Sequence, residues 1–565
     1  NLLTLSTDDD DITLDALSAT TGFDGTVLEI AATITTFVNI NSISGVGGTD
    51  SLTGLDLETN WSVDVVTNQY TDVTTGNSLT FTDIESLNGG SEPDSFAVLG
   101  SQVANLSGGV GNDSFTFLSD GAVLDGNIDG GTGIDTLNLS IYDSGLVVTL
   151  TSAGTDDGLK GSTSAVAVPP GEPNPITGTF DSIDVLTSGT ASDTIVGFDT
   201  PADWTLATTG VYLIGGTDPG SGQDLDFTNI ENFTGGAEVD TFSIASGFSL
   251  VGGTIDGGGE SDFLVQADET NTWNITGADA GDVTDVANGF SSIENLTGGI
   301  GADEFRFAPG VKIFGDVDGG GTMAGPDVLD LRLYTTPVDI TIIAGGTDHG
   351  LKGSATSSTG TDVDPIDGEF DNIDSLLGNT GGGNTLTGPD SANTWDITAL
   401  NAGTLNAVPF ENMPSLTGGN DADTFTFNGG TLDGAIDGGG AATDTIVGEI
   451  SSPNAFLVTL SNGGTFAPIT NGFTNVENLT GGTFDDTFSI DSGATLTGDI
   501  DGGGGTDGIT LTDGTNDWNI TTPDAGDVTS IINAFSDIEN LTGGTGDDTF
   551  NIASGATLTG SSSTV

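Results

Sequence analysis

The chain is built from a sequence unit that recurs about every 62 residues. The phrase IENLTGGIGADEFRF begins at Ile293, and similar phrases begin at Ile230, Val476 and Ile538. The aspartate in the same slot of the unit recurs at Asp240, Asp303, Asp423, Asp486 and Asp548. Successive copies of this aspartate are 63, 120, 63 and 62 residues apart, so one interval is doubled. Self-similarity at a fixed period predicts a repeat architecture rather than one globular core.

Each unit divides into shorter pieces of about 20 residues that alternate apolar and polar residues and are punctuated by Gly, Asp or Asn. The unit that begins at Trp273 reads WNITGADAGDVTDVANGF, SSIENLTGGIGADEFRFAPG and VKIFGDVDGGGTMAGPDVLDLRL. A piece of this length matches one coil of a parallel β-solenoid, either a β-helix or a β-roll. The sequence therefore predicts an all-β parallel β-solenoid with about 20–22 residues per coil. Tandem β-sandwiches are the rival fold, but their domains span about 100 residues.

The repeat frame also suggests how the chain is organised. Residues 1–56 lack clear copies and are expected to form atypical N-terminal solenoid coils, followed by a repetitive rod over 57–565. Two segments with a GLKG motif, 151–179 and 344–369, show little alternation and are expected to project as loops. Lys160 and Lys352 in these motifs are 192 residues apart, so three units make a longer super-repeat. Neither chain end shows an amphipathic cap, so we expect either a longer chain or end-to-end self-association.

The charge balance excludes several classes of partner. The chain has 83 Asp and Glu residues against five Lys and Arg, a formal net charge of -78, and no Cys. Five cations cannot form the basic surface that nucleic acid or an anionic membrane requires. No apolar run of about 18 residues is present, so membrane insertion is not expected. The absence of Cys excludes disulfides and thiolate sites and is compatible with an extracellular location, the compartment that we expect.

The sharpest chemical pattern is GGxGxDxUx, in which U is a large apolar residue. It occurs as GGVGNDSFT (108–116), GGTGIDTLN (130–138), GGIGADEFR (298–306), GGGGTDGIT (502–510) and GGTGDDTFN (543–551). This pattern resembles the RTX nonapeptide repeats of secreted calcium-binding proteins and of large bacterial surface adhesins. The resemblance implies a β-roll in which turn carbonyls and Asp carboxylates bind Ca²⁺ while the U residue fills the core. RTX arrays repeat the motif back to back, whereas here it returns once per coil, so at most one edge is expected to bind ions.

The spacing of the aspartates supports a calcium site independently of that resemblance. Ca²⁺ requires six to eight oxygen ligands, more than one turn supplies, so two stacked turns must share an ion. Asp113 and Asp135 are 22 residues apart, which places them one coil apart. The candidate ligands expected on the strands that follow the turns are Asp94, Asp113, Asp135, Asp240, Asp262, Asp303, Asp423, Asp444, Asp486, Asp507 and Asp548. A further set stands just before the glycines: Asp129, Asp256, Asp318, Asp437 and Asp501. Turns of this composition also suit the corners of any solenoid, and an acidic surface also suits high salt.

These observations favour a non-catalytic extracellular protein, a calcium-stabilised rod of a bacterial surface adhesin, surface layer or filament. The alternative is a β-helix that binds or processes polysaccharides. Catalysis is disfavoured because Lys160 and Lys352 are copies of one repeat position. In addition, His349 aligns with an Asp of the other GLKG copy and is expected on a surface loop. A glycan-binding ladder would use the Trp residues, but all five share one slot of the repeat, which favours a common structural role in the core.

Overall fold

The structure is a computed structural model that describes residues 1–29, 34–166, 173–214, 223–267, 269–321, 325–359 and 363–563. These residues form strands, turns and connecting segments without a helix, and thus none of them forms a helix suited to crossing a membrane. The predicted all-β parallel β-solenoid is confirmed. The contacts divide the chain into a first unit, residues 1–267 and 282–293, and a second unit, residues 268–281 and 294–565.

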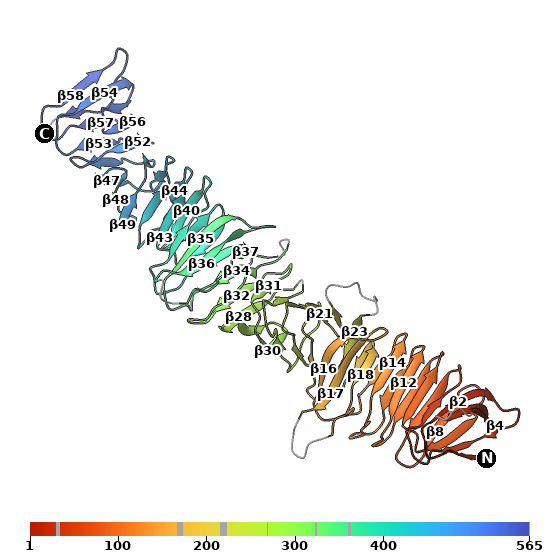
Figure 1. Ribbon diagram of the computed structural model, residues 1–565. Coiled ribbons are helices and arrows are strands. Elements are labelled where there is room, and N and C mark those ends of the chain that lie inside the picture. Colours follow the sequence, from red (N-terminus) through yellow and green to blue (C-terminus); the bar gives the residue numbers. More distant parts are fainter. Residues whose placement is uncertain are drawn as a thin grey trace. The chain divides into compact units, whose positions relative to one another are not determined.

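In each unit the chain alternates between two sheets, so one coil adds one strand to each sheet. Strand β12 (Asn105–Val110) pairs in parallel with β10 (Ser86–Gly90) and with β14 (Ile128–Thr132), and β12 and β14 lie side by side in Figure 1. Ser86 is in register with Asn105, and Leu106 with Ile128, which corresponds to coils of 19 and 22 residues. These coil lengths agree with the sequence period.

Single strands make up most of both sheets. The first unit contains β1 (Leu2–Thr4), β5 (Ser42–Ser44), β6 (Ser51–Thr53), β10, β11 (Asp94–Val98), β12, β13 (Ser114–Phe117), β14, β15 (Thr136–Asn138), β19 (Val185–Thr187), β20 (Thr194–Val196), β24 (Asn232–Thr234), β25 (Asp240–Ile244), β26 (Ile255–Asp256) and β27 (Phe263–Val265). The second unit contains β31 (Asn295–Thr297), β32 (Glu304–Phe307), β33 (Val317–Asp318), β34 (Val328–Asp330), β38 (Ser375–Leu377), β39 (Thr385–Thr387), β43 (Ser415–Gly419), β44 (Thr424–Phe427), β45 (Ile436–Gly439), β46 (Thr445–Val447), β50 (Asn478–Thr480), β51 (Thr487–Ile490), β52 (Leu496–Asp501), β53 (Gly508–Leu511), β57 (Asn540–Thr542), β58 (Thr549–Ile552) and β59 (Ser562–Ser563).

At intervals the chain adds a three-stranded antiparallel meander to one sheet. In the first unit the meanders are β2 (Asp10–Leu17), β3 (Phe23–Glu29) and β4 (Ile34–Ile40); β7 (Thr59–Val63), β8 (Asn68–Asp72) and β9 (Ser78–Thr82); β16 (Leu146–Ala153), β17 (Leu159–Ala165) and β18 (Phe180–Ile183); and β21 (Ala202–Leu206), β22 (Gly210–Ile214) and β23 (Asp224–Thr228). In the second unit they are β35 (Val338–Gly345), β36 (Leu351–Ser357) and β37 (Phe370–Ile373); β40 (Thr394–Ala399), β41 (Ala402–Leu405) and β42 (Val408–Glu411); β47 (Ala455–Leu460), β48 (Gly463–Phe466) and β49 (Ile469–Thr474); and β54 (Asp517–Thr522), β55 (Ala525–Val528) and β56 (Ile532–Ser536). Strands β28 (Thr272–Gly277), β29 (Ala280–Val283) and β30 (Val286–Ser291) lie where the chain passes between the units.

Successive meanders within a unit lie in opposite sheets. The first strands of neighbouring meanders, such as β40 and β47, belong to different sheets because an even number of single strands, here β43–β46, separates them. The same spacing separates β47–β49 from β54–β56. In this part of the chain each repeat consists of one meander and four single strands, whereas only two single strands, β38 and β39, separate β35–β37 from β40–β42.

The core consists of rows of apolar side chains that stack from coil to coil. One row of the first unit runs through Leu52, Leu87, Leu106, Ile128 and Phe180, which are in register on successive parallel strands and at most 1% exposed. Parallel strands lie about 4.8 Å apart, so equivalent side chains of neighbouring coils are in contact. Burying a side chain of this size contributes roughly 1.5–3 kcal/mol, which accumulates along each row.

All five Trp residues lie in this core. They are at most 1% exposed and are Trp61, Trp204, Trp273, Trp395 and Trp518. Each stacks on a Phe of the next parallel strand, as Trp395 does on Phe425 at 5.4 Å between ring centroids. The common structural role predicted from their shared repeat slot is therefore confirmed.

The two GLKG segments carry the middle strands of two meanders. Strand β17 lies within 151–179 and β36 within 344–369, and each pairs with both neighbouring strands of its meander. Residues 167–172 and 360–362 of these segments lie outside the described residues. The N-terminal meander β2–β4 falls within residues 1–56, where atypical coils are expected.

Candidate metal centre

The aspartates expected on the strands that follow the glycine turns stand at the first residue of a strand or directly before it. Asp94 begins β11, Asp113 precedes β13 and Asp135 precedes β15. Their side chains are at most 2% exposed, as are those of Asp240, Asp262, Asp303, Asp423, Asp444, Asp486 and Asp507, whereas Asp548 is half-buried. The motif thus directs its carboxylates beneath the turns rather than into solvent.

Backbone hydrogen bonds link these aspartates from coil to coil. In the first unit the backbone N–H of Asp94 donates to Oδ1 of Asp113, that of Asp113 to Oδ1 of Asp135, and that of Asp135 to Oδ2 of Asp184, each at 2.7 Å. We refer to these buried, coil-linking aspartates as the carboxylate ladder. The predicted one-coil stacking of Asp113 and Asp135 is thus seen as a direct contact.

The second unit contains the same arrangement. The N–H of Asp423 donates to Asp444 at 2.8 Å, and the N–H of Asp486 donates to Asp507 at 2.6 Å. A glutamate accepts the last hydrogen bond of these two runs, since the N–H of Asp444 donates to Glu477 and that of Asp507 to Glu539, whereas the run from Asp303 through Asp327 ends at Asp374. The ladder therefore satisfies backbone N–H groups that single strands leave without a sheet partner.

The first glycine of each GG turn makes room for a ladder carboxylate. A Cβ on Gly108 would lie 2.2 Å from Oδ2 of Asp113 and 2.5 Å from the carbonyl oxygen of Gly130. The second glycine, Gly109, adopts a φ of 102° and would also collide with the coil before it. The GG pair is thus required by sterics and backbone conformation whether or not an ion is bound.

The ladder carboxylates differ in how many of their oxygens accept hydrogen bonds. In Asp94, Asp240 and Asp486 both oxygens accept, and in each case Oδ2 takes the N–H of the second turn glycine. By contrast, Oδ2 is buried without a hydrogen-bond donor among the described residues in Asp113, Asp135, Asp303, Asp444, Asp507 and Asp548. This second group has an oxygen available for a cation or a proton.

Burial raises the pKa of the ladder carboxyls. Desolvation, reinforced by the charges of Asp113, Asp184 and Asp157, raises the pKa of Asp135 to about 7. Desolvation likewise raises the pKa of Asp303 to about 7 and that of Asp444 to about 7. The ladder therefore concentrates carboxyl groups whose charged form is unfavourable without a positive partner.

The aspartates that stand before the glycines occupy a different environment. These five outer aspartates, Asp129, Asp256, Asp318, Asp437 and Asp501, are half-buried. Asp318 accepts the N–H of Gly320 at 2.8 Å, and Asp437 and Asp501 accept the N–H two residues ahead in the same way. Asp318 also accepts from Nδ2 of Asn372 on the neighbouring coil. Asp318, Asp437 and Asp501 therefore brace their own turns, and Asp318 and Asp437 each also accept from an asparagine of the neighbouring coil.

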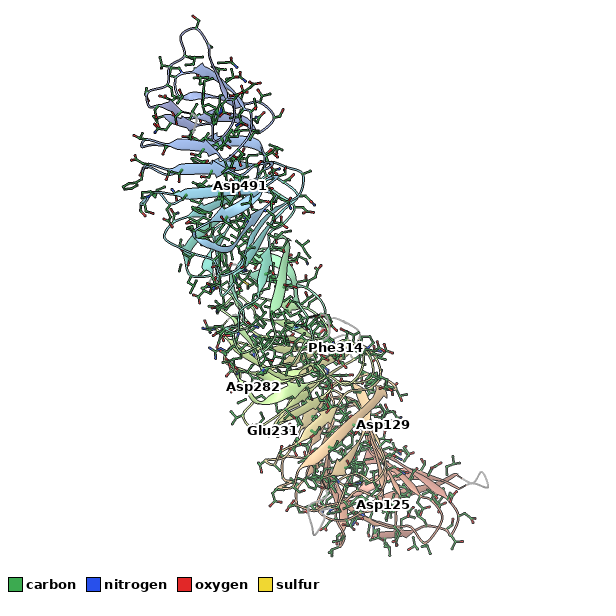
Figure 2. The ribbon with its side chains drawn as sticks, turned by 90° about the vertical axis from the view of Figure 1, so that its left-hand side faces the viewer. Asp125, Asp129, Glu231, Asp282, Phe314 and Asp491 are labelled. Atoms are coloured by element: carbon green, nitrogen blue, oxygen red, sulfur yellow. The ribbon has the colours of Figure 1, made fainter. Side chains whose placement is uncertain are left out.

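Acidic side chains lie along both units, for example Asp125 and Glu231 in the first and Asp491 in the second (Figure 2). The five Lys and Arg residues pair with acids outside the ladder. Lys160 contacts Asp181 at 2.7 Å, Lys312 contacts Asp367 at 2.6 Å and Lys352 contacts Glu369 at 2.9 Å. Arg306 and Arg332 contact Glu304 and Asp330. Among the described residues, none of these ion pairs involves Asp94, Asp113, Asp135, Asp444 or Asp507 of the ladder.

Two clusters bring three potential metal ligands together among the described residues. One consists of Asp135, Asp157 and Asp184, and the other of Asp327, His349 and Asp374. Within each cluster, one ligand atom from each residue lies within 4.8 Å of the others. Both clusters involve a GLKG meander. Asp135 and Asp327 are 192 residues apart in sequence, and so are Asp157 and His349, as expected for copies in the super-repeat.

Sequence reasoning identified Asp135 but missed the other members of these clusters. Asp184 and Asp374 recur in the phrases DSID and DNID, at the position where other repeats carry the ladder-closing glutamate of IEN or VEN. That recurrence was visible in the sequence. The buried position of His349 was not, because its place in a GLKG segment suggested a surface loop.

No protein-family model and no curated protein sequence matches this chain.

Proposed function

We propose that this chain is a non-catalytic structural protein, a calcium-stabilised β-solenoid of an extracellular bacterial adhesin, surface layer or filament. The observation that carries the proposal is the carboxylate ladder, in which buried aspartates of neighbouring coils are linked in series with no Lys or Arg partner. Charges placed this close repel unless a cation or a proton neutralises them.

Calcium is the cation that suits these groups. It binds carboxylate and carbonyl oxygens in flexible geometry, and the turns offer both kinds of ligand. The ligands are expected among the carboxylates with an oxygen that accepts no hydrogen bond, such as Asp113, Asp444 and Asp507. Asp94, Asp240 and Asp486 are expected to act through hydrogen bonds alone, since both of their oxygens accept.

A scaffold role fits the use of the remaining chemical groups. The Trp side chains are buried, so they offer no stacking platform for sugars. The Lys and Arg side chains are engaged in ion pairs, which leaves none dedicated to neutralising an acidic substrate. The extracellular assignment draws on the absence of Cys and on the likeness of the GGxGxD turns to RTX repeats.

The test is thermal unfolding of the purified chain, followed by circular dichroism, in excess EGTA and in millimolar Ca²⁺ at pH 8. Calcium should raise Tm, because each site filled at about 100 times its Kd adds about 2.7 kcal/mol to the free energy of unfolding. Mg²⁺ at the same concentration serves as the control for ionic strength and should raise Tm less. Identical melting curves in EGTA and Ca²⁺ would refute the calcium-stabilised scaffold.

A further inference from the structure

We propose that Asp135, Asp157 and Asp184 of the first unit bind one hard divalent cation, Ca²⁺ in the extracellular setting, and that the imidazole of His349 takes the place of that cation in the second unit. This inference deepens the calcium role proposed above and rests on it for the identity of the ion. The GGxGxD turns alone would not form this site, because only Asp135 belongs to such a turn and the other two ligands come from other elements.

Three separate elements bring the three carboxylates of the first unit together. Asp135 directly precedes β15, Asp157 lies in the turn between β16 and β17, and Asp184 lies between β18 and β19. One carboxylate oxygen from each residue lies within 4.8 Å of the other two. A cation between them would therefore tie a meander turn to the carboxylate ladder.

Two buried oxygens of this cluster accept no hydrogen bond from the described residues. Asp135 is 0% exposed, and its Oδ1 accepts the N–H of Asp113 while its Oδ2 has no donor. Asp157 accepts the N–H of Gly133 through Oδ2, while its Oδ1 is buried without a donor. Buried oxygens without donors cost free energy, and a bound cation would supply the missing interaction.

The charges that act on the cluster are negative. Those that act on Asp135 belong to Asp113, Asp184 and Asp157. Those that act on Asp184 belong to Asp157 and to two aspartates of β23, Asp224 and Asp226. A divalent cation would reduce this repulsion.

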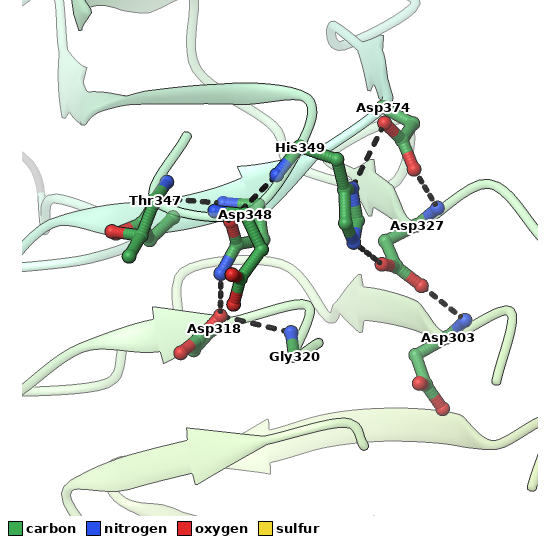
Figure 3. A network of polar contacts seen from close by, with 10 residues as sticks. Asp303, Asp318, Gly320, Asp327, Thr347, Asp348, His349 and Asp374 are labelled. Carbon is green, nitrogen blue, oxygen red and sulfur yellow. Dashed lines mark hydrogen bonds and ion pairs between the residues drawn. The ribbon is translucent and has the colours of Figure 1, made fainter. Parts of the chain in front are cut away.

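In the second unit an imidazole lies where the first unit has its third carboxylate. Nδ1 of His349 is 3.2 Å from Oδ1 of Asp374, and Nε2 is 3.6 Å from Oδ2 of Asp327 (Figure 3). The His349 side chain is only 8% exposed. The ring thus lies between the two carboxylates and can donate an N–H to a carboxylate oxygen, which a third carboxylate cannot do.

Residues near the cluster also differ between the two copies, and the copy with the histidine again has fewer carboxylates. Phe227 of β23 is in register with Leu186, and Phe410 of β42 is in register with Leu376, which aligns the two strands. The positions of Asp224 and Asp226 are then taken by Ala407 and Pro409. The copy with the histidine therefore also has fewer carboxylates, as expected if it needs no ion.

The ligand set selects the class of metal. Three carboxylates form an oxygen-only set, which suits Ca²⁺ over metals that prefer nitrogen or sulfur, and carbonyl groups or water complete the coordination shell. His349 and its two aspartates would instead suit Zn²⁺ if the ring were a ligand. The proposal holds that the ring replaces the ion, so zinc binding at this position is an outcome that counts against it.

The test exchanges the two residues in the full chain. Asp157→His should remove one bound Ca²⁺ per chain, and His349→Asp should add one, as counted by equilibrium dialysis with radioactive calcium at saturation. Each variant carries the residue that the other copy already accommodates, so both are expected to keep the wild-type circular dichroism spectrum. The double exchange should restore the wild-type number of ions.

Several results would overturn the inference. An unchanged calcium count in a folded Asp157→His variant would show that the cluster holds no ion. Zn²⁺ bound to the wild-type chain but not to His349→Ala would show that the ring is a ligand rather than a substitute. The scaffold proposal is tested separately. If the wild-type chain has the same Tm in EGTA and in Ca²⁺, that proposal fails even if Asp157→His binds one ion fewer. A calcium-dependent Tm with an unchanged count in Asp157→His would contradict only the site assigned here.

Discussion

Asp501 and Asp507 belong to the same glycine-rich turn, yet the chain uses their carboxylates differently. Asp507 is 1% exposed and accepts the N–H of Asp486 from the preceding coil at 2.6 Å. Asp501 is half-buried and accepts the N–H of Gly503 in its own turn at 3.1 Å. One carboxylate links two coils, and the other braces a single turn. Residue type alone therefore does not determine what an aspartate contributes here, because its position relative to the glycines decides which hydrogen-bond donor it meets.

The largest expected effect is a loss of stability with rising pH in the calcium-free chain. Burial raises the pKa of Asp94, Asp135, Asp303 and Asp444 to about 7 each, above the unfolded value of 3.8. The folded state then holds more protons than the unfolded state between these values, so the free energy of unfolding falls as pH rises. We expect Tm in EGTA to decrease continuously from pH 5 to pH 8.

Calcium and a single substitution sharpen this test of the ladder. Saturating Ca²⁺ should flatten the dependence of Tm on pH, because a bound cation replaces the proton. Asp444→Asn should reduce the slope in EGTA, because one of the raised groups no longer titrates. A Tm that is constant or increases over this pH range in EGTA would show that the ladder carboxyls are not destabilised by their burial.

The next largest effect concerns the glycine on which Asp507 packs. A Cβ on Gly502 would lie 2.0 Å from the carbonyl oxygen of Asp537 and 2.7 Å from Oδ2 of Asp507. A Cβ on Gly504, two residues later, would meet no atom closer than 3.8 Å. We expect Gly502→Ala to lower the free energy of unfolding by about 3 kcal/mol, and Gly504→Ala by about 1 kcal/mol or less. Urea unfolding of the two variants measures the difference, and equal losses would contradict the role given to the first glycine.

Substituting the two aspartates themselves should give a smaller contrast. Asp507→Ala leaves the N–H of Asp486 without its acceptor, at a cost of about 2 kcal/mol. Asp501→Ala removes a half-buried brace and should cost about 0.5 kcal/mol. Urea unfolding at pH 5 limits the contribution of carboxylate repulsion to either value.

Asp507→Asn provides a matched control because it keeps an oxygen acceptor while removing the charge. The chain already contains such a case, since buried Asn384 accepts the N–H of Val338 at 3.0 Å and donates to two carbonyl groups. The Asn variant should therefore be more stable than the Ala variant. If the two are equally unstable, the hydrogen bond between coils is not what Asp507 contributes.

The smallest effect is expected for the surface ion pair of Lys160 and Asp181. The Lys160 side chain is 37% exposed, and pairs of this kind contribute about 0–1 kcal/mol. We expect Lys160→Met to change Tm only slightly at low salt and not measurably at high salt. A loss as large as that of Asp507→Ala would mean that this surface pair is as important as the buried ladder.

Much of the fold could be predicted because the repeats record it directly. The 22-residue separation of Asp113 and Asp135 gave the coil length, and their stacking followed from it. The antiparallel strands were not predicted, since pieces such as AGTL of β41 are short and their pairing depends on the turn before them. Reading each repeat as three similar pieces therefore missed the meander.

The candidate site could be predicted in part for a similar reason. The motif identified the aspartates but not the depth of their burial, since Asp240 and Asp486 are buried as deeply as Asp113 although Gly236 and Gly482 do not share the positive φ of Gly109. The pairing of Asp135 with Asp157 requires β16 and β17 to fold back on the ladder. Residue spacing alone does not encode that return.

The alternation of meanders between the two sheets has a consequence for how such a gene can change in length. The three strands of a meander lie in one sheet, and the chain changes sheet at every single strand. A repeat of one meander and four single strands therefore ends with the next meander in the opposite sheet, so loss or gain of one copy transfers every later strand to the opposite sheet. Both sheets carry the same inward and outward alternation, so the apolar rows continue across the junction. Recombination between copies can thus shorten or lengthen the protein while exchanging the two sheets for all later strands. A second event of the same kind returns these strands to their original sheets.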